Sequence, residues 1–209
     1  KFKSKHAGTF GDGGAFSFFP TKVMTTIEGG MITTDNEDLS KIAKSIRNQG
    51  KRDGNYGGLH YDMGSSWRIS EVSASIGILQ LKKLNKMINA RAKNVFELTK
   101  LFDSMKLQYC STKHMESASH YKLILIMSCE EEAKKIKSKA SQKGIFFGGG
   151  VYEIPCHKHP VFSNVDYEKN ELKNSEIWCS RQVCPPITSG TTSEQTLTIK
   201  NFIKDYFNA

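Results

Sequence analysis

A short segment near the start of the chain offers a hydroxyl and an amine close to the predicted end of a strand. Residues 15–19 form a compact apolar run that Pro20 ends, which is typical of a buried strand leading into a loop. Ser17 lies within this strand, and Lys22 follows the proline. Because open α/β sheets bind ligands where strands end, the two side chains could meet a phosphate and an aldehyde. The simpler interpretation of the pattern alone is a surface lysine after a proline turn.

The amine of Lys22 could form a Schiff base only in its neutral form. A lowered pKa is therefore required, and burial among Phe16, Phe18 and Phe19 would lower it. We expect these three rings to shield the amine from water.

Short strands and one helix would position this segment. Residues 28–30 indicate a turn, and residues 31–34 predict a second strand. Asp35 can then cap a helix whose apolar side chains recur at helical spacing, namely Leu39, Ile42, Ala43 and Ile46. Residues 48–64 are polar and rich in glycine, which predicts a long loop of the kind that usually carries function.

The longest periodic segment opens at Ser70 and continues to Phe102. A helix of about thirty residues, at 1.5 Å each, is roughly 50 Å long. That length exceeds one small domain, so we expect the helix to leave one domain and enter the next. Residues 1–105 would form a partial large domain, and residues 106–209 a small C-terminal α+β domain.

The second half of the chain shows an α+β pattern. Residues 121–127 and 145–147 predict strands. The three glycines at 148–150 predict a flexible segment by which the chain leaves the second of these strands.

Two helices in this half carry cap signals. Ser128 with Glu131 predicts a capping box for a helix that Gly144 would stop. Thr192 with Gln195 predicts the start of a final helix.

Composition and charge narrow the class of protein. Hydrophobic residues make up 38% of the 209 and charged residues 24%, which excludes a disordered low-complexity chain and a small disulfide scaffold. The net charge of +9 fits a nucleic acid or an anionic small substrate, but lysines scattered over solvated helix faces explain it more simply. We expect no nucleic-acid partner. Neither an apolar run of about 18 residues nor a signal peptide is visible, so we expect no membrane partner either.

The cysteines and histidines of the second half raise the question of a metal site. An odd number of cysteines, five, without a secretion signal predicts reduced thiols and a cytoplasmic protein. Residues 156–159 read Cys-His-Lys-His, and Cys179 and Cys184 follow, which could suggest zinc. The C-x-x-C pair typical of such sites is absent, so we expect no metal.

Several stretches resemble one known family. Residues 8–12 read Gly-Thr-Phe-Gly-Asp, residues 15–22 read Ala-Phe-Ser-Phe-Phe-Pro-Thr-Lys, and residues 25–31 read Thr-Thr-Ile-Glu-Gly-Gly-Met. Arg-Asn-Gln-Gly at 47–50 and Trp-Arg-Ile-Ser-Glu at 67–71 continue the match. Together they resemble the signature of the sugar aminotransferases often called the DegT/DnrJ/EryC1/StrS family. Weaker matches at residues 155–157 and 184–187 extend the resemblance over essentially the whole chain.

The resemblance implies an α/β fold of the aspartate-aminotransferase type (fold type I) and pyridoxal 5'-phosphate as cofactor. Lys22 matches the lysine that holds this cofactor and, once freed, moves a proton, and Ser17 matches a serine that binds its phosphate. Arg68 lies where the family reaches across a dimer interface toward the neighbour's phosphate, although it could instead cap its own helix region. Ser66 stands where many members have asparagine, and His157 matches a histidine near the substrate.

The family's full chain is much longer than this one. The resemblance implies that the aromatic residue stacking on the cofactor, and the acidic residue at the ring nitrogen, lie upstream of Lys1. We therefore expect a C-terminal portion, one half of a split enzyme, or a degraded copy.

The implied function is transfer of an amino group, from glutamate as donor, to a keto-sugar linked to a nucleotide, in amino-sugar or surface-polysaccharide synthesis. Some relatives carry histidine at the position of Lys22 and dehydrate sugars, so Lys22 favours transamination. The implied partners are a second copy in a homodimer and a separate N-terminal half. The alternative is a non-catalytic remnant that serves as a binding or dimerisation module.

Overall fold

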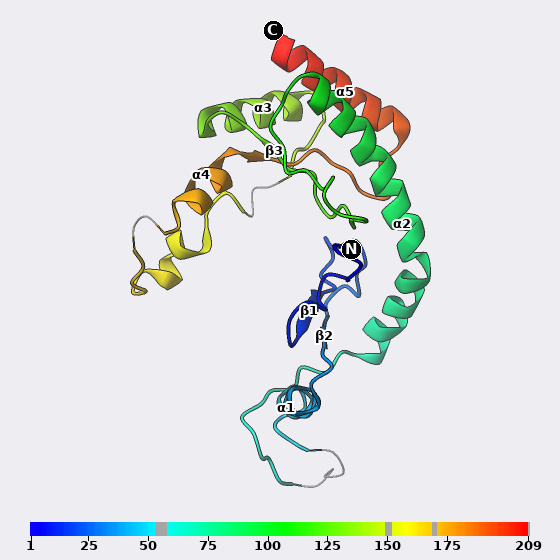
Figure 1. The fold of residues 1–209 in the computed structure, drawn as a ribbon, viewed down its shortest axis with the longest axis vertical. Helices are drawn as coiled ribbons and strands as arrows, with labels where there is room; N and C mark the ends of the chain where they lie inside the picture. Colours follow the sequence, from blue (N-terminus) through cyan, green and yellow to red (C-terminus); the bar gives the residue numbers. More distant parts are fainter. Residues whose placement is uncertain (53–57, 149–151, 169–170, 209) are drawn as a thin grey trace. The chain divides into compact units, whose positions relative to one another are not determined.

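The computed structural model describes residues 1–52, 58–148, 152–168 and 171–208. Short antiparallel strand pairs and five α-helices follow one another along the described chain (Figure 1). The elements are β1 (Gly14–Ser17), β2 (Gly30–Thr33), α1 (Glu37–Arg47), α2 (Glu71–Ser104), β3 (Leu125–Ile126), α3 (Glu130–Gln142), η2 (Cys156–Lys158), η3 (Pro160–Phe162), α4 (Lys173–Arg181), β4 (Gln182–Val183) and α5 (Ser193–Asn208).

The chain divides into two compact units. The first unit comprises Lys1–Met87 and Lys113–Ala118, and the second comprises Ile88–Thr112 and Ser119–Ala209. The units reflect packing alone, so the assignment of residues 1–105 and 106–209 to two functional domains stays a prediction.

A two-stranded ribbon, β1 with β2, forms the sheet of the first unit. The strands are antiparallel, with Ser17 opposite Gly30, and the predicted second strand is confirmed. Three of the four β1 residues are exposed, and the rings of Phe16 and Phe19 are 40% and 46% exposed. The expectation of a buried strand is therefore wrong. Within the described residues β1 has one strand neighbour, and a ribbon of two strands cannot enclose its own side chains.

Helix α1 begins one residue later than the sequence predicts. The side chain of Asn36, rather than that of Asp35, accepts a hydrogen bond from the Leu39 backbone N–H at 3.0 Å. Asn36 is in extended backbone conformation, as an N-cap residue must be. Of the predicted apolar stripe, Leu39 is partly buried, whereas Ile42 is 51% exposed.

The long helix α2 is confirmed and contains 34 residues. It starts where predicted, since the Ser70 hydroxyl oxygen accepts a hydrogen bond from the Ser73 N–H at 3.1 Å. The boundary between the two units falls inside it, between Met87 and Ile88, so the helix belongs to both units. No helix in the described ranges combines the length and the apolar character that crossing a bilayer requires.

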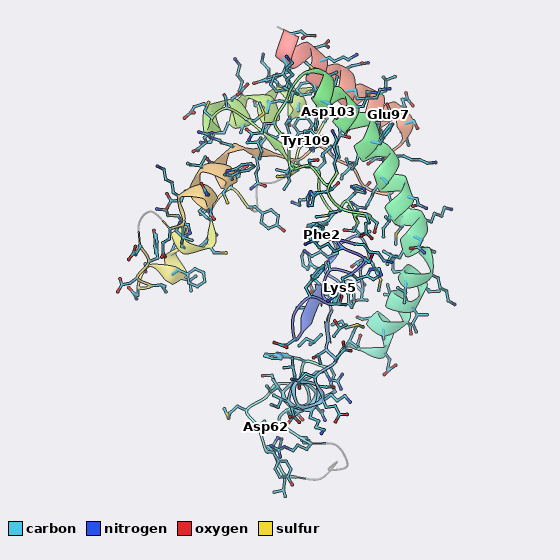
Figure 2. All side chains as sticks on the ribbon, in the orientation of Figure 1. Phe2, Lys5, Asp62, Glu97, Asp103 and Tyr109 are labelled. Atoms are coloured by element: carbon cyan, nitrogen blue, oxygen red, sulfur yellow. The ribbon has the colours of Figure 1, made fainter. Side chains whose placement is uncertain are left out.

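The hydrophobic core of the second unit joins the end of α2 to α3, α5 and the β3–β4 pair. Leu98, Phe102, Leu125, Ile136 and Ile203 are among its fully buried members. Salt bridges and hydrogen bonds lie around this core; the Tyr109 hydroxyl, for example, donates to the Asp103 carboxylate at 2.9 Å (Figure 2).

The strands of the second unit are shorter than predicted. Of residues 121–127, only Leu125 and Ile126 form a strand, because their partner β4 is itself two residues long. Residues 145–147 form no strand; the neighbouring Gly148 makes a single bridge to Cys184 instead. The other two glycines of the flexible segment predicted after this strand, at 149 and 150, lie outside the described residues.

The cap signals of the second unit are confirmed in one case and shifted in the other. The Thr192 N–H donates to the Gln195 side chain at 2.9 Å, and the Gln195 N–H to the Thr192 hydroxyl at 3.2 Å. At α3, Ser128 pairs with Glu132 and not with the predicted Glu131, because the helix starts at Glu130. Gly144, at φ +73°, follows the end of α3 as predicted.

Candidate functional site

Lys22 lies on a tightly hydrogen-bonded loop that joins β1 to β2. The Phe18 N–H donates to the Gly29 carbonyl at 2.9 Å, and the Phe18 carbonyl accepts from the Thr26 N–H and the Thr25 hydroxyl, each at 2.9 Å. The Lys22 N–H donates to the Phe19 carbonyl at 2.9 Å and forms the turn after the proline. Hydrogen bonds therefore join the start and the end of the loop, and Lys22, which is partly buried, lies on the loop just after β1.

Thr26 packs the loop against helix α2. Its side chain is 1% exposed, and its hydroxyl donates to the Glu28 carbonyl at 2.8 Å. Its methyl group faces Gly77 of α2, since a Cβ added at Gly77 would lie 2.9 Å from Thr26 Cγ2. Only glycine at position 77 allows this close approach of loop and helix.

We expect Gly77→Ala to destabilise the chain by about 1 kcal/mol. The added methyl group overpacks against Thr26 Cγ2, at a cost of about 1–3 kcal/mol, and the better helix propensity of alanine, about 1 kcal/mol, offsets part of it. Urea unfolding measures the difference. Thr26→Ser removes Cγ2 but keeps the hydroxyl bond to Glu28, so Gly77→Ala in that background should cost little. An equal loss in both backgrounds would contradict the packing argument.

Ser17 ends β1 with an exposed side chain. Its hydroxyl oxygen accepts a weak hydrogen bond from the Phe19 N–H at 3.4 Å. A serine hydroxyl can accept and donate at once, so this contact leaves its hydrogen to donate to a ligand. Ser17 therefore lies at the end of β1, and Lys22 lies at the end of the turn that starts at Phe19, while their roles toward a cofactor stay predictions.

Arg68 lies on the segment that leads into α2. Its guanidinium Nη1 donates to the Asn48 side-chain oxygen at 2.6 Å, a contact with the C-cap residue of α1 that sequence reasoning missed. The next residue, Ile69, lies against the β1–β2 loop, since its Cδ1 would be 3.2 Å from a Cβ at Gly29. Arg68 therefore belongs to the same unit as Ser17 and Lys22, and its segment contacts their loop.

The missed contact between Asn48 and Arg68 had a signal in the sequence. Both residues lie in the stretches at 47–50 and 67–71 that carry the family resemblance. The structure joins these stretches directly, through a bridge between Asn48 and Ser66 and a hydrogen bond from the Trp67 N–H to the Arg47 carbonyl at 2.9 Å.

His157 lies in the second unit, on the short helix η2. Its side chain is 12% exposed, its Nε2 lies 3.0 Å from the Glu176 carboxylate, and the Tyr167 ring packs edge-on at 4.8 Å. Glu176 also binds the Lys158 ammonium at 2.9 Å, and hydrogen bonds from Lys158 and then His157 lower the pKa of this carboxyl. The imidazole is thus held by an ionised carboxylate, while its predicted role near a substrate stays a prediction.

The expected shielding of Lys22 by aromatic rings is wrong for Phe16 and Phe19. Both rings are exposed, and Phe18 is only partly buried. As for metals, no three potential ligands lie together in the ranges that the structure describes.

The loop after α1 is closed by backbone contacts between its two ends. The Gln49 N–H donates to the Ser65 carbonyl at 3.1 Å, and the Ser65 N–H to the Ile46 carbonyl at 2.9 Å. Gly50, at φ +78°, accepts hydrogen bonds through its carbonyl from the N–H groups of Tyr61 (2.8 Å) and Asp62 (3.2 Å). Backbone hydrogen bonds therefore join the two described parts of the predicted long loop, 48–52 and 58–64.

The fold is that of sugar aminotransferases. The chain aligns over its full length with Helicobacter pylori PseC, an aminotransferase involved in the biosynthesis of pseudoaminic acid, at a TM-score of 0.87 and 21% identity. It also aligns over 99% of its length with the PLP-form of Spr1654, a putative sugar aminotransferase from Streptococcus pneumoniae, at a TM-score of 0.86 and 19% identity. The predicted fold type I architecture is confirmed.

The chain belongs to the DegT/DnrJ/EryC1/StrS aminotransferase family, whose model matches residues 1–204. It is 32% identical to an uncharacterized protein of Methanocaldococcus jannaschii over 98% of its length, and 26% identical to the GDP-perosamine synthase of Escherichia coli O157:H7 over 100%. The chain spans about half of these relatives, 56% and 55% of their lengths, and 56% and 54% of the two solved structures.

Proposed function

We propose that this chain is the lysine-bearing part of a pyridoxal-phosphate-dependent aminotransferase, which transfers an amino group from glutamate to a keto-sugar linked to a nucleotide. Family membership supports the reaction class, and relatives named for the synthesis of amino sugars support the substrate class. The observation that carries the proposal is the loop that holds Lys22 at the end of β1 beside Ser17.

The side chains around this loop fit the proposed cofactor. An amine, a hydroxyl and a guanidinium are the groups that a phosphorylated aldehyde requires. Lys22 would hold the aldehyde carbon, and Ser17 would donate to the phosphate. Arg68 would reach across the interface of the proposed homodimer and add charged hydrogen bonds to the phosphate held by the partner copy. When bound, pyridoxal phosphate supplies an electron sink for the bond-breaking step.

The chain's own residues then perform positioning and proton transfer. The Lys22 Nζ would take a proton from the α-carbon of the amino donor and return one to the carbon that receives the amine. Two sets of contacts would hold the loop in position during this transfer. Thr25 and Thr26 donate hydrogen bonds to the Phe18 carbonyl, and Thr26 packs against Gly77.

Exposed apolar side chains on the β1–β2 ribbon and on the segments beside it support a partner that covers the first unit. Six of these residues are 40–61% exposed: Phe10, Phe16, Phe19, Ile27, Met31 and Ile32. Phe16 and Met31 are cross-strand neighbours on one face of the ribbon, and Ile32, the next residue of β2, lies on the other face. Clusters of large exposed apolar side chains are typical of interaction sites. We propose that a further segment, on the same or a separate chain, covers these side chains. This segment would correspond to the part of the relatives that the chain does not span. A homodimer and a cytoplasmic location complete the proposal.

The direct test is amino transfer by the chain combined with the N-terminal half of a relative or of its own gene. With pyridoxal phosphate, glutamate and a nucleotide-linked keto-sugar, mass spectrometry should detect the amino-sugar and 2-oxoglutarate in equal amounts. A complex that forms but transfers nothing would contradict the proposed enzyme. That outcome would favour the alternative function, a non-catalytic dimerisation module, which the same exposed side chains support.

A further inference from the structure

Two cysteines lie on neighbouring elements of the second unit. Cys156 is the first residue of the short helix η2, and Cys179 lies in the last turn of α4. Both are free, as are the other three cysteines of the chain. Cys156 is exposed and Cys179 is partly buried, so a dissolved oxidant can reach the first thiol directly.

Two ionic contacts hold η2 against α4. The His157 Nε2 lies 3.0 Å from the Glu176 carboxylate, and the Lys158 ammonium binds the same carboxylate at 2.9 Å. Figure 1 shows the yellow segment that contains η2 beside α4. Cys156 directly precedes His157 in η2. Cys179 follows Glu176 by three residues in α4, and residues three apart share one helix face, with Cβ atoms about 5–6 Å apart. Cys179 therefore lies on the face of α4 that receives η2.

A second set of contacts holds the chain before η2 against the end of α4. The Gln182 side-chain Nε2 donates to the Tyr152 carbonyl at 2.7 Å and to the Cys179 carbonyl at 3.2 Å. One amide group thus joins the backbone of Cys179 to the segment that leads into η2. Because Cys156 lies between Tyr152 and His157 in the sequence, contacts on both sides of it hold the chain along α4. The two sets of contacts bring Cys156 and Cys179 within reach of each other.

The titration of Cys179 supports this proximity. Burial raises the pKa of the Cys179 thiol, and the charge of Cys156 raises it further. Such a charge effect falls off with distance, so the two sulfur atoms are neighbours. Since the Cys179 thiol is hard to ionise and Cys156 is exposed, Cys156 is the thiol that reacts first with an oxidant.

Cys110 and Cys184 offer an internal comparison. The bridge between Tyr109 and Leu125 and the pairing of Leu125 with Val183 place the strand of Leu125 between the two cysteines. Neighbouring strands are about 4.8 Å apart, so two strand spacings separate these cysteines by about 9–10 Å. A disulfide requires Cα atoms within about 7 Å of each other. Cys110 and Cys184 therefore cannot bond without a movement of the backbone.

We propose that Cys156 and Cys179 form a reversible disulfide when the chain meets a peroxide. The Cys156 thiolate attacks one peroxide oxygen, the O–O bond breaks, and the leaving hydroxide takes up the proton of the thiol and departs as water. The Cys179 sulfur attacks the resulting sulfenic acid, the S–S bond forms, and the sulfenic hydroxyl leaves with the Cys179 proton as a second water. The two sulfur atoms are oxidised and the two peroxide oxygens are reduced. The bond would link η2 to α4 covalently beside the carboxylate that holds them together.

Thiol counting and peptide mapping of the chain test the proposal. After treatment with stoichiometric hydrogen peroxide, the folded chain should lose two of its five thiols to maleimide labelling. Mass mapping without reductant should find the Cys156 peptide joined to the Cys179 peptide, with two hydrogens lost, and dithiothreitol should restore both thiols. A chain that keeps all five thiols would overturn the proposal. So would a main product that joins another pair, or that is a sulfinic acid at Cys156.

Matched variants assign the two sulfur atoms. Cys179→Ser should leave a sulfenic acid at Cys156, which dimedone traps, whereas Cys156→Ser should leave Cys179 unmodified. Equal dimedone labelling of the two residues would contradict the order of the steps. Cys110→Ser and Cys129→Ser each remove one thiol elsewhere and should still form the bond. Loss of the bond in either of these variants would show that it forms through that residue and would overturn the assignment.

An unfolded sample separates the effect of the structure from chance. In concentrated urea the fold no longer holds η2 against α4, and short loops close more readily than long ones. Cys179 and Cys184, five residues apart, should then bond in preference to Cys156 and Cys179. The same dominant Cys156–Cys179 bond in folded and unfolded chains would remove the structural basis of the inference. None of these measurements depends on amino transfer, so their results are independent of the proposed function.

Discussion

Lys22→Arg is expected to abolish amino transfer, by roughly 10³-fold or more, because proton transfer by a positioned group alone contributes about 10²–10⁴-fold. Arginine keeps the charge and much of the volume, but it stays protonated and can neither form the covalent bond nor carry the proton. The measurement is the rate of 2-oxoglutarate formation by the chain combined with the N-terminal half of a relative, with wild type and variant compared at equal protein concentration.

A second measurement on the same variant does not depend on activity. Borohydride should fix pyridoxal phosphate to the wild-type chain, and peptide mass mapping should place the label on the Lys22 peptide. Lys22→Arg should lose the label, and Lys83→Arg, an exposed position on α2, should keep it. A label that persists in Lys22→Arg, or that maps to another lysine, would exclude Lys22 as the attachment site.

Gly50→Ala is expected to open the loop that follows α1 and to destabilise the first unit by about 2–5 kcal/mol. Gly50 has φ +78°, where a side chain costs about 1–2 kcal/mol. The added Cβ would also overlap the carbonyl oxygen of Asp62, a backbone atom that cannot move aside as a side chain can, and overpacking costs about 1–3 kcal/mol more.

Amide hydrogen exchange is the most direct measurement for this variant. The N–H groups of Tyr61 and Asp62 donate to the Gly50 carbonyl, so their protection should fall in Gly50→Ala before the rest of the chain unfolds. Gly58→Ala is the matched control, because Gly58 has φ +77° but a Cβ there meets no heavy atom of the described chain within 4 Å. In Gly58→Ala the hydrogen-exchange protection of the Tyr61 N–H should be unchanged. An equal loss of protection in the two variants would rule out the overlap with Asp62 as the cause.

Local signals predicted four of the five α-helices in the described chain, namely α1, α2, α3 and α5, but not α4 or the short strands of the second unit. The Ser70 start of α2 and the reciprocal bonds of Thr192 and Gln195 depend on residues three positions apart, which a sequence displays directly. The errors at Asp35 and Glu131 are shifts of one residue, and they arise where a neighbouring side chain can make the same bond. Such competition is decided by backbone geometry, which the sequence does not show.

Tertiary contacts set the limit of prediction at the candidate site. The position of Lys22 after a strand and a proline was visible, because strand, turn and amine are consecutive in the chain. The contact of Thr26 with Gly77, and the bond from Arg68 to Asn48, join residues far apart in sequence. The exposure of Phe16 was mispredicted for a related reason, since burial depends on what lies above a strand and not on the strand itself.

The ribbon of β1 and β2 has a consequence for how this protein can be produced. Within the described residues neither strand pairs with a third, so the outer edge of each offers main-chain donors and acceptors to any extended peptide nearby. Several exposed apolar side chains beside those edges raise the risk that newly synthesised chains aggregate. Co-expression with a covering segment, either fused in one polypeptide or encoded as a separate chain, should raise the soluble yield far more than a lower growth temperature does.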